Sequence, residues 1–511
     1  MALSDTHPAY TARLPDWIVM GDCYEGERAV KEKTDEYLPA TANMITDGYG
    51  TSGSPGQNAY DAYLARAVFP SDVSDSVEAN IGVAHRKPPG VAVPTAMEPL
   101  LKALTVDRAD METLLRRINE AQLTFGRCGL LVDVPTGKGA DAMPYVCKYG
   151  ATAILNWSTY QPEGGNERLE LVVLDESGMV QDNELVWKEQ KQYRVLALAE
   201  RMIERGLLDG AQLRGVTTGY VVGVTTNSTT LQSCEWTQPV LRGKALEEIP
   251  FTFVNVQDLS DCPDKPPLLG LAQTCLAIYR GEADRRQALF MQGQETLVLT
   301  GVDEDNDPEK ESAPKRVGAG AMISLPAGGD AKYVGVGASG LAEMREALAE
   351  DRQLAAQKGM RLHDATEGAS GQSGDALGIR VAARTASLVG LVRAGGAALQ
   401  RALGHCAMFL GMDPEAVVVE PNIDFAEDMM TGEELGQWAA AKRMGAPVSW
   451  QTIYDIMLNR GVATRTWEEE QALIDDEEPA SGTGMDPNDP NQQDQNANGA
   501  EDQNQNDPPV N

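Results

Sequence analysis

The sequence predicts an α+β fold built around two long antiparallel helices that are separated by a small β-containing insert. Three observations indicate this arrangement. Residues 265–292 and 339–362 carry helical periodicity, the insert at 293–338 contains the strand-like runs TLVLTG, AMISLP and AKYVGV, and residues 126–256 hold short β-branched runs separated by turn residues. With 511 residues the chain should form more than one compact unit, because single cores stop growing at about 250–300 residues.

The first 264 residues divide into a helical part and a β-rich part. Residues 1–59 begin with helix-compatible segments followed by a Gly-rich loop near 47–60, and residues 60–125 alternate helical stretches with turns. Between 126 and 256, runs such as GLLVDV, LELVVL, YRVLAL, GYVVGVTT and IPFTFVNV predict strands, with a short helix near LALAERMIERG. The sequence shows no internal repeat at the period of a solenoid.

Start signals and apolar spacing support both long helices. Pro266 and Pro267 stand at a favourable helix beginning, and Ser339 is a suitable N-cap. The apolar positions are Leu268, Leu271, Leu276, Ile278 and Tyr279 in the first helix and Leu341, Met344, Leu348 and Ala355 in the second. In isolation these are ordinary amphipathic helices with solvated charges. Packed side by side around a symmetry axis, they would form a rigid tube.

The insert between the helices contains a charged segment. Its charged residues are Asp303, Glu304, Asp305, Asp307, Glu309, Lys310, Glu311, Lys315 and Arg316. Because the segment projects from two antiparallel helices, it lies at the end of a hairpin, where a docking partner would reach it. A merely solvated loop is the alternative.

A helix break at 363–378 separates the second helix from a third, longer one at 379–412. The break contains four glycines and small polar residues, which are poor helix formers, so the sequence predicts a mobile loop. After the third helix, a strand-like run at 415–425 leads to short helical segments at 431–445, 449–461 and 467–476, which predict a small helical subdomain.

The formal net charge of −33 argues against tight, sequence-independent binding of nucleic acid, since that affinity comes from Lys and Arg neutralising phosphates. An acidic wall is compatible with a polyanion sliding past it, although a solubilising surface charge explains the composition without it. Residues 475–511 hold ten acids and no Lys or Arg, and this Asn/Gln/Pro-rich tail is predicted to be disordered. Contact of the tail with a partner or with DNA is the functional alternative.

Composition also excludes several classes of protein. No stretch approaches the about 20 apolar residues of a membrane span, and the N-terminus lacks a signal pattern, so we expect a soluble, unprocessed chain. The seven cysteines are dispersed and form no CxxC pairs. They predict reduced thiols and no zinc site.

The sequence contains no complete motif for catalysis or cofactor binding. Gly335, Gly337 and Gly340 spell GxGxxG, but the second parallel strand of a dinucleotide site does not follow. Asp303, Asp305 and Asp307 resemble the start of a calcium loop, yet prolines occupy its sixth and twelfth positions. There is no Walker A motif, and none of the four histidines has a catalytic context. We therefore expect no enzyme, no cofactor and no metal.

Several sequence blocks, taken in order, resemble the portal proteins of tailed bacteriophages. They are the WxxxxDCYEGERAVKEKTDEYLP block (Trp17–Pro39), the YDAYLARAVFP block (Tyr60–Pro70), HRKPP (His85–Pro89), FGRCGLLVDVP (Phe125–Pro135), and the pair Asn156 and Trp157. Together with the helix–insert–helix–break–helix order, the blocks span about residues 15–475. No single block is chemically diagnostic, and the resemblance depends on their order.

The resemblance implies a portal-like architecture with named parts. These are a β-containing wing at 1–264, a two-helix stem at 265–292 and 339–362, a small α/β clip at 293–338, a tunnel loop at 363–378, a long bent wing helix and strand at 379–430, a helical crown at 431–474, and the acidic tail at 475–511.

The resemblance also implies roles for individual residues. The DNA-facing tunnel loop would present His363, Asp364, Thr366, Glu367, Ser370, Gln372, Ser373 and Asp375. The stem would line the channel with Arg280, Arg285, Arg286, Arg345, Arg352, Lys358 and Arg361, and the clip would dock partners through Asp303, Glu304, Asp305, Asp307, Glu309, Lys310, Lys315 and Arg316.

The function implied is a homo-oligomeric ring of twelve subunits at one capsid vertex, through which double-stranded DNA is packaged, retained and ejected. Its partners would be the terminase large subunit, a head-tail adaptor, and the major capsid or scaffolding protein, with no membrane. The ring would belong to the virion and be assembled in the host cytoplasm. The alternative is another structural ring of the virion, such as a head-to-tail adaptor.

Overall fold

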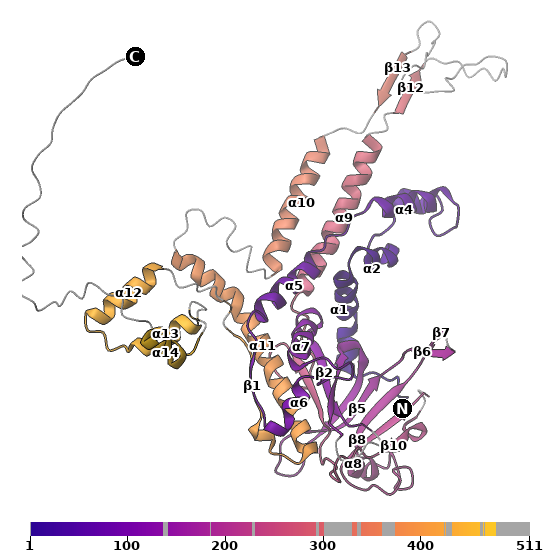
Figure 1. The fold of residues 1–511 in the computed structure, drawn as a ribbon. Coiled ribbons are helices and arrows are strands. Elements are labelled where there is room, and N and C mark those ends of the chain that lie inside the picture. Colours follow the sequence, from indigo (N-terminus) through magenta and orange to yellow (C-terminus); the bar gives the residue numbers. More distant parts are fainter. Residues whose placement is uncertain are drawn as a thin grey trace, which may run out of the picture. The chain divides into compact units, whose positions relative to one another are not determined.

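The arrangement of helices and strands is shown by a computed structural model (Figure 1). It describes residues 2–135, 142–183, 185–226, 230–292, 296–300, 330–334, 339–359, 374–423, 425, 432–459, 463 and 465–476. The chain divides into two units, Met1–Phe425 and Ala426–Asn511. Both helices and strands occur, as the predicted α+β class requires.

Within residues 2–135, the first unit begins with seven α-helices, of which four start at a side-chain cap. The seven are α1 (Pro8–Glu25), α2 (Glu27–Glu32), α3 (Ala42–Thr46), α4 (Pro55–Arg66), α5 (Asp72–Ala84), α6 (Glu98–Leu101) and α7 (Met111–Phe125). The capped helices are α1, α3, α4 and α7. The Ser54 hydroxyl accepts a hydrogen bond from Gln57 N at the start of α4, and Asp110 accepts one from Thr113 N at the start of α7. Such caps satisfy backbone donors that have no partner inside the helix.

Two antiparallel sheets form the β-rich part. One has the order β10-β9-β8-β5-β4 and the other β11-β2-β3. Their strands are β2 (Arg127–Asp133), β3 (Tyr145–Gly150), β4 (Ile154–Tyr160), β5 (Arg168–Asp175), β8 (Tyr193–Leu198), β9 (Tyr220–Thr225), β10 (Glu235–Thr237) and β11 (Phe251–Asn255). The short helix α8 (Ala199–Glu204) lies where the sequence predicts one. Three strand pairs stand apart: β1 (Gly90–Ala92) with β14 (Val418–Glu420), β6 (Gly178–Asn183) with β7 (Val186–Gln190), and β12 (Thr296–Thr300) with β13 (Asp330–Val334).

Gly126 makes the turn from α7 into β2. Its φ of +73° lies in the left-handed region, which glycine adopts without the steric cost of a Cβ. A Cβ at this position would lie 3.1 Å from the Asp264 and Lys265 backbones. Position 126, between Phe125 and Arg127, therefore requires glycine for two reasons: its backbone conformation and the lack of room for a Cβ.

Three long helices follow, as the periodicity predicts: α9 (Leu269–Gln292), α10 (Ser339–Lys358) and α11 (Gly374–Leu410). Four boundaries differ from the prediction: α9 starts at Leu269 and not at 265, α11 ends at Leu410 and not at 412, and two further boundaries shift by four or five residues. The second helix ends at Lys358, before the predicted end at 362, and α11 begins at Gly374, so that 374–378 are helical where the sequence predicts loop. Glycine costs about 1 kcal/mol in a helix interior, and helix propagation from the long apolar segment that follows overrides this weak local preference.

Two hydrophobic cores share the helix α11. Its Leu388, Leu391 and Val392 belong to a core with α1, α4, α5, α9 and α10, whereas the later stretch from Ala398 onward packs with α7 and the sheets. Between these stretches α11 crosses α7 closely, because a Cβ on Gly395 would lie 2.2 Å from Asn119 Oδ1. At the same crossing, Gln122 Nε2 donates to Leu391 O at 3.2 Å. The crossing therefore requires glycine at 395.

The second unit contains α12 (Gly432–Arg443), α13 (Trp450–Asn459) and α14 (Trp467–Asp476). Tyr454 and Trp467 meet edge to face with ring centroids 5.3 Å apart, and Tyr454 OH donates to Arg465 O. The sequence predicts that Asp475 and Asp476 belong to the disordered tail. This is wrong for both residues, because the helix α14 that begins at Trp467 extends to Asp476. The rest of the predicted tail lies outside the described residues.

No helix in the described ranges combines the length and apolarity of a membrane span. The cysteines are free thiols, of which Cys262 is exposed and Cys147 is half-buried, and the others are buried.

Candidate functional site in the paired helices

The helices α9 and α10 lie side by side, with β12 and β13 continuing from the ends that the insert joins (Figure 1). Leu348 on α10 packs over Gly281 on α9, where a Cβ would come within 3.1 Å of the leucine. Within α10, the buried side chains are Leu348 and Ala355. The pairing therefore covers one narrow stripe of α10 and leaves most of that helix in solvent.

The buried carboxylate of Glu282 forms ion pairs with three arginines of the two helices. The side chain of Glu282 is 4% exposed and receives Arg285 Nη2 at 2.7 Å and Arg286 Nε at 2.7 Å, both from α9. From α10, Arg352 Nη2 lies 3.6 Å from the second oxygen of Glu282. The hydrogen bond from Arg285, and then that from Arg286, lowers the pKa of Glu282, although burial acts in the opposite direction. An opposite charge within about 4–6 Å favours the ionised carboxylate.

The basic residues predicted to line the stem are therefore not equivalent. Arg285, Arg286 and Arg352 converge on Glu282, Arg280 is exposed on α9, and Arg345 is exposed on α10. Arg361 lies outside the described residues. Glu282 itself is absent from the sequence-based set, although its spacing of three and four residues before Arg285 and Arg286 is the signal that would have found it.

Lys358 attaches the C-terminal end of α10 to α9. Its Nζ donates to Thr274 Oγ1 on α9 at 2.8 Å. The next residue, Gly359, accepts a hydrogen bond from Asn80 Nδ2 of α5 at 3.3 Å, and a Cβ there would lie 2.6 Å from Ser76 Oγ. This predicted lining residue has a structural role in joining α10 to α9.

The helix α4 supports the opposite half of α9. Tyr63 OH donates to Asp284, and Arg66 donates to Gln287. The guanidinium carbon of Arg66 also lies 4.1 Å from the centre of the Phe290 ring, a distance at which the ring attracts a cation. None of these contacts follows from the sequence, because they join residues more than 200 positions apart.

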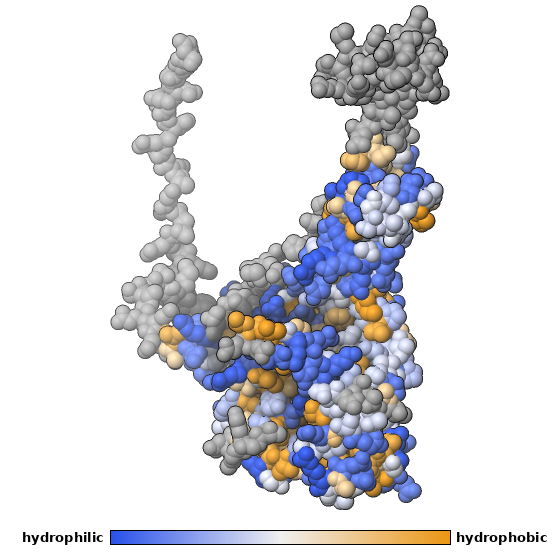
Figure 2. Space-filling view, turned by 90° about the vertical axis from the view of Figure 1, so that its right-hand side faces the viewer, coloured by the Kyte–Doolittle hydropathy of each residue, from blue (hydrophilic) through white to orange (hydrophobic). Residues whose placement is uncertain are grey.

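A groove of about 750 Å³ opens between α9 and α10 near the insert. It is lined by Arg285, Leu289, Leu341, Ala342, Arg345, Glu346 and Ala349. Exposed apolar side chains lie on both helices: Leu289, Phe290 and Met291 on α9, and Met344 and Leu354 on α10. Figure 2 shows hydrophobic residues where the helix pair meets the grey segment. The pair thus presents apolar surface that the described residues leave uncovered.

The insert starts and ends with the antiparallel pair β12–β13, in which Thr296 lies opposite Val334 and Thr300 opposite Asp330. The predicted docking residues from Asp303 to Arg316 lie outside the described residues. The tunnel-loop residues from His363 to Ser373 do so as well, whereas Asp375 lies in the first turn of α11. Within the described ranges, no three His, Cys, Asp or Glu side chains form a cluster that could hold a metal ion.

A family described as "Domain of unknown function (DUF4055)" matches residues 267–410, a segment that begins just before α9 and ends with α11. No curated protein matches the chain. The solved structure "Neck of native GTA particle computed with C12 symmetry" is similar at 12% identity and a TM-score of 0.38, covering 81% of this chain and 96% of that chain. "Neck of empty GTA particle computed with C6 symmetry" is similar at 13% identity and a TM-score of 0.37, covering 82% and 98%.

Proposed function

We propose that this chain is the subunit of a homo-oligomeric ring in a tailed-bacteriophage-like particle and that the ring is the portal for double-stranded DNA. The observation that carries the proposal is the apolar surface on the α9–α10 pair, with Leu289, Phe290, Met291, Met344 and Leu354 exposed. Contiguous exposed apolar surface marks interaction sites on soluble proteins. Neighbouring copies, arranged side by side, would cover it and form a tube.

The charge distribution supports a channel through which DNA slides. The chain carries a formal net charge of −33, which repels phosphate. Three of the five described arginines predicted to line the stem, Arg285, Arg286 and Arg352, already share the carboxylate of Glu282, so their contacts with phosphate would be weak. Arg280 and Arg345 are exposed. Affinity for DNA rises with each phosphate that a free Lys or Arg neutralises. We propose that this arrangement lets the duplex move without being held.

The remaining parts of the proposal follow the resemblance in the sequence. The insert between β12 and β13 would dock the terminase large subunit during packaging and a head-tail adaptor afterwards. The segment between α10 and α11 would face the DNA, and a capsid or scaffolding protein would hold the ring at one vertex. The three long helices favour a portal over a head-to-tail adaptor, which would usually be shorter and lack them.

Electron microscopy of the purified protein tests the proposal. Wild-type protein should form rings with a central hole, whereas a Leu289→Glu, Met344→Glu double variant should remain a folded monomer, because it places charges in the buried contact. Val106→Glu changes another exposed apolar residue, outside the helix pair, and should assemble normally. A wild-type protein that is monomeric over all salt and protein concentrations would overturn the proposal. Short rings that do not support DNA packaging would favour the adaptor.

A further inference from the structure

The hairpin built from β5, β6, β7 and β8 ends in an exposed apolar tip, which is the β6–β7 pair. The β5–β8 pair continues outward as β6–β7, a two-stranded ribbon that belongs to neither large sheet. The ribbon carries Trp187 at 58% exposure and Leu185 at 89%, together with exposed Met179, Val180 and Val186. A two-stranded ribbon is only marginally stable in water. Five exposed apolar residues on such a ribbon indicate a surface that packs against another protein surface.

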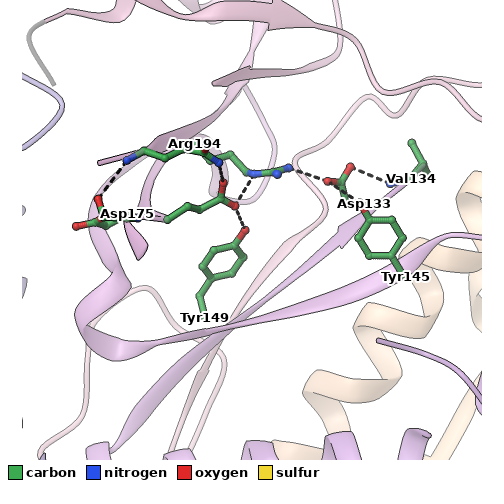
Figure 3. A network of polar contacts seen from close by, with 9 residues as sticks. Asp133, Val134, Tyr145, Tyr149, Asp175 and Arg194 are labelled. Atoms are coloured by element: carbon green, nitrogen blue, oxygen red, sulfur yellow. Dashed lines mark hydrogen bonds and ion pairs between the residues drawn. The ribbon is translucent and has the colours of Figure 1, made fainter. Parts of the chain in front are cut away.

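The base of this ribbon is held in place by a partly buried ionic network (Figure 3). Arg194 on β8 donates to Asp133 at 2.7 Å through Nη1 and to Glu176 at 2.7 Å through Nε. Tyr149 OH donates to the same Glu176 oxygen at 2.6 Å, and Gln192 Nε2 donates to the other oxygen at 2.8 Å. Glu176 and Gln192 lie in the two-residue connections, 176–177 and 191–192, that join β5–β8 to β6–β7. The network therefore sets the direction in which the tip projects.

The strand register divides the tip into two faces. Met179 pairs with Glu189 and Gln181 with Trp187, so that Met179 and Trp187 are diagonal neighbours on one face. The other face carries Val180 and the ion pair between Lys188 and Asp182. The first face thus presents an aromatic and a thioether side chain flanked by polar groups, which is the composition of an interface anchor.

A cavity elsewhere on the same chain has a mixed lining of apolar and charged residues. It measures about 220 Å³ and is lined by the apolar residues Leu169, Leu198, Ile249, Phe251, Phe253 and Leu259. Charged residues of both signs complete its wall, among them Glu247, Asp261 and Arg401. Apolar surroundings with a polar margin are typical of the pockets that receive an aromatic anchor.

We propose that the β6–β7 tip of one copy inserts Trp187 into this cavity of the next copy, which would fix neighbouring subunits of the ring in a head-to-tail order. The inference rests on the proposed ring. A projection and a pocket at different places on one chain produce a heterologous contact, which closes into a ring when the rotation between copies is a whole fraction of a turn. An apolar anchor suits this chain because copies that each carry a net charge of −33 repel one another.

Replacement of the anchor tests the contact directly. Trp187→Ala should leave the monomer fold unchanged, since the side chain is mostly exposed, and should raise the protein concentration needed for half-assembly by about tenfold or more, as expected for an anchor residue. Trp450→Ala, at a half-exposed tryptophan of the second unit, is the matched control and should assemble as the wild type does. Circular dichroism of the dilute monomers checks the fold.

Cross-linking identifies the partner surface. Cys262 is exposed and follows Asp261 at the cavity wall. Cysteine placed singly at Leu185, Val186 or Lys188 should form covalent dimers and higher ladders with a short bis-maleimide in assembled rings, and Cys262→Ser should abolish them. Unchanged assembly of Trp187→Ala, or no ladder from any of the three positions, would overturn this contact while leaving the ring proposal intact. Failure of the wild type to form rings would remove both.

Discussion

Arg352 on α10 places its Nη2 atom 3.6 Å from Oε2 of Glu282 on α9. This is the one ion pair among the described residues that joins the two helices across their interface. Because Glu282 also accepts hydrogen bonds from Arg285 and Arg286 of its own helix, its burial between the helices depends on all three guanidinium groups. The pairing of α9 with α10 is therefore both apolar, through Leu348, and ionic, through Glu282.

Glu282→Gln should destabilise the helix pair. The substitution keeps the shape of the side chain but removes the charge that the three arginines share, and hydrogen bonds to charged groups contribute about 1.5–3 kcal/mol each. Exposure of Arg286 and Arg352 reduces the expected loss in the free energy of unfolding to about 1–3 kcal/mol. Urea denaturation measures it, with Glu343→Gln on the exposed face of α10 as the control. Equal stabilities of the two variants would contradict the role of Glu282.

The same carboxylate should make the helix pair sensitive to acid. Since the folded pKa of Glu282 lies below its ordinary value of 4.5, its stabilising contribution is complete above that ordinary value. The contribution is lost as the pH falls through the lower, folded pKa. The difference in the free energy of unfolding between the wild type and Glu282→Gln should therefore shrink below about pH 4.5. Titration of both proteins by thermal unfolding tests this, and a constant difference down to pH 2.5 would argue against it.

Alkaline pH should destabilise the first unit through its buried phenols and thiols. Burial raises the pKa of Tyr279 from 10.0 to about 12 and that of Cys234 from 9.0 to about 11. Because only the unfolded chain ionises between these values, stability is complete below about pH 9 and falls as the pH rises further. Tyr279→Phe should remove part of this loss, and it should be tolerated at neutral pH because Tyr279 OH has no hydrogen-bond partner among the described residues. Unchanged alkaline sensitivity in Tyr279→Phe would show that other groups dominate.

Two glycines of α11 should respond oppositely to alanine. Gly395→Ala places a Cβ 2.2 Å from Asn119 Oδ1, whereas Gly390→Ala meets no atom within 4 Å. Overpacking of a tight contact costs about 1–3 kcal/mol, while alanine in an open helix position stabilises by about 0.5–1 kcal/mol. Thermal unfolding should therefore rank Gly390→Ala above the wild type and Gly395→Ala below it. The opposite ranking would mean that α11 does not cross α7 at Gly395.

Deletion of Asp303–Arg316, with a short Gly/Ser turn closing the gap, tests the docking role proposed for the insert. The change falls between β12 and β13, outside the paired strands, so we expect rings to assemble as the wild type does. DNA packaging should be lost, because the partner-binding surface is removed. Packaging at the wild-type level by such rings would exclude docking through this segment.

Much of the secondary structure depends on local signals and was predictable. Helical spacing of apolar residues and the prolines before Leu268 indicate α9, and alternating β-branched runs indicate β2, β5, β8, β9 and β11. The start of α11 was not predictable from propensity, since the glycines at 374 and 378 oppose a helix that the long segment after them propagates. The prediction of a loop at these positions considered the low helix propensity of the glycines and neglected helix propagation from the residues that follow them.

The contacts within the candidate site could not be predicted from the local sequence pattern. The sequence by itself determined that α9 and α10 carry arginines, because charge and helical spacing are local properties. Only the tertiary structure decided that Arg285, Arg286 and Arg352 share Glu282, that Lys358 bonds Thr274, and that Trp187 remains exposed. Burial and ion pairing depend on which residues distant in sequence come together, and that is set by the packing of whole helices and sheets rather than by the pattern within any one of them.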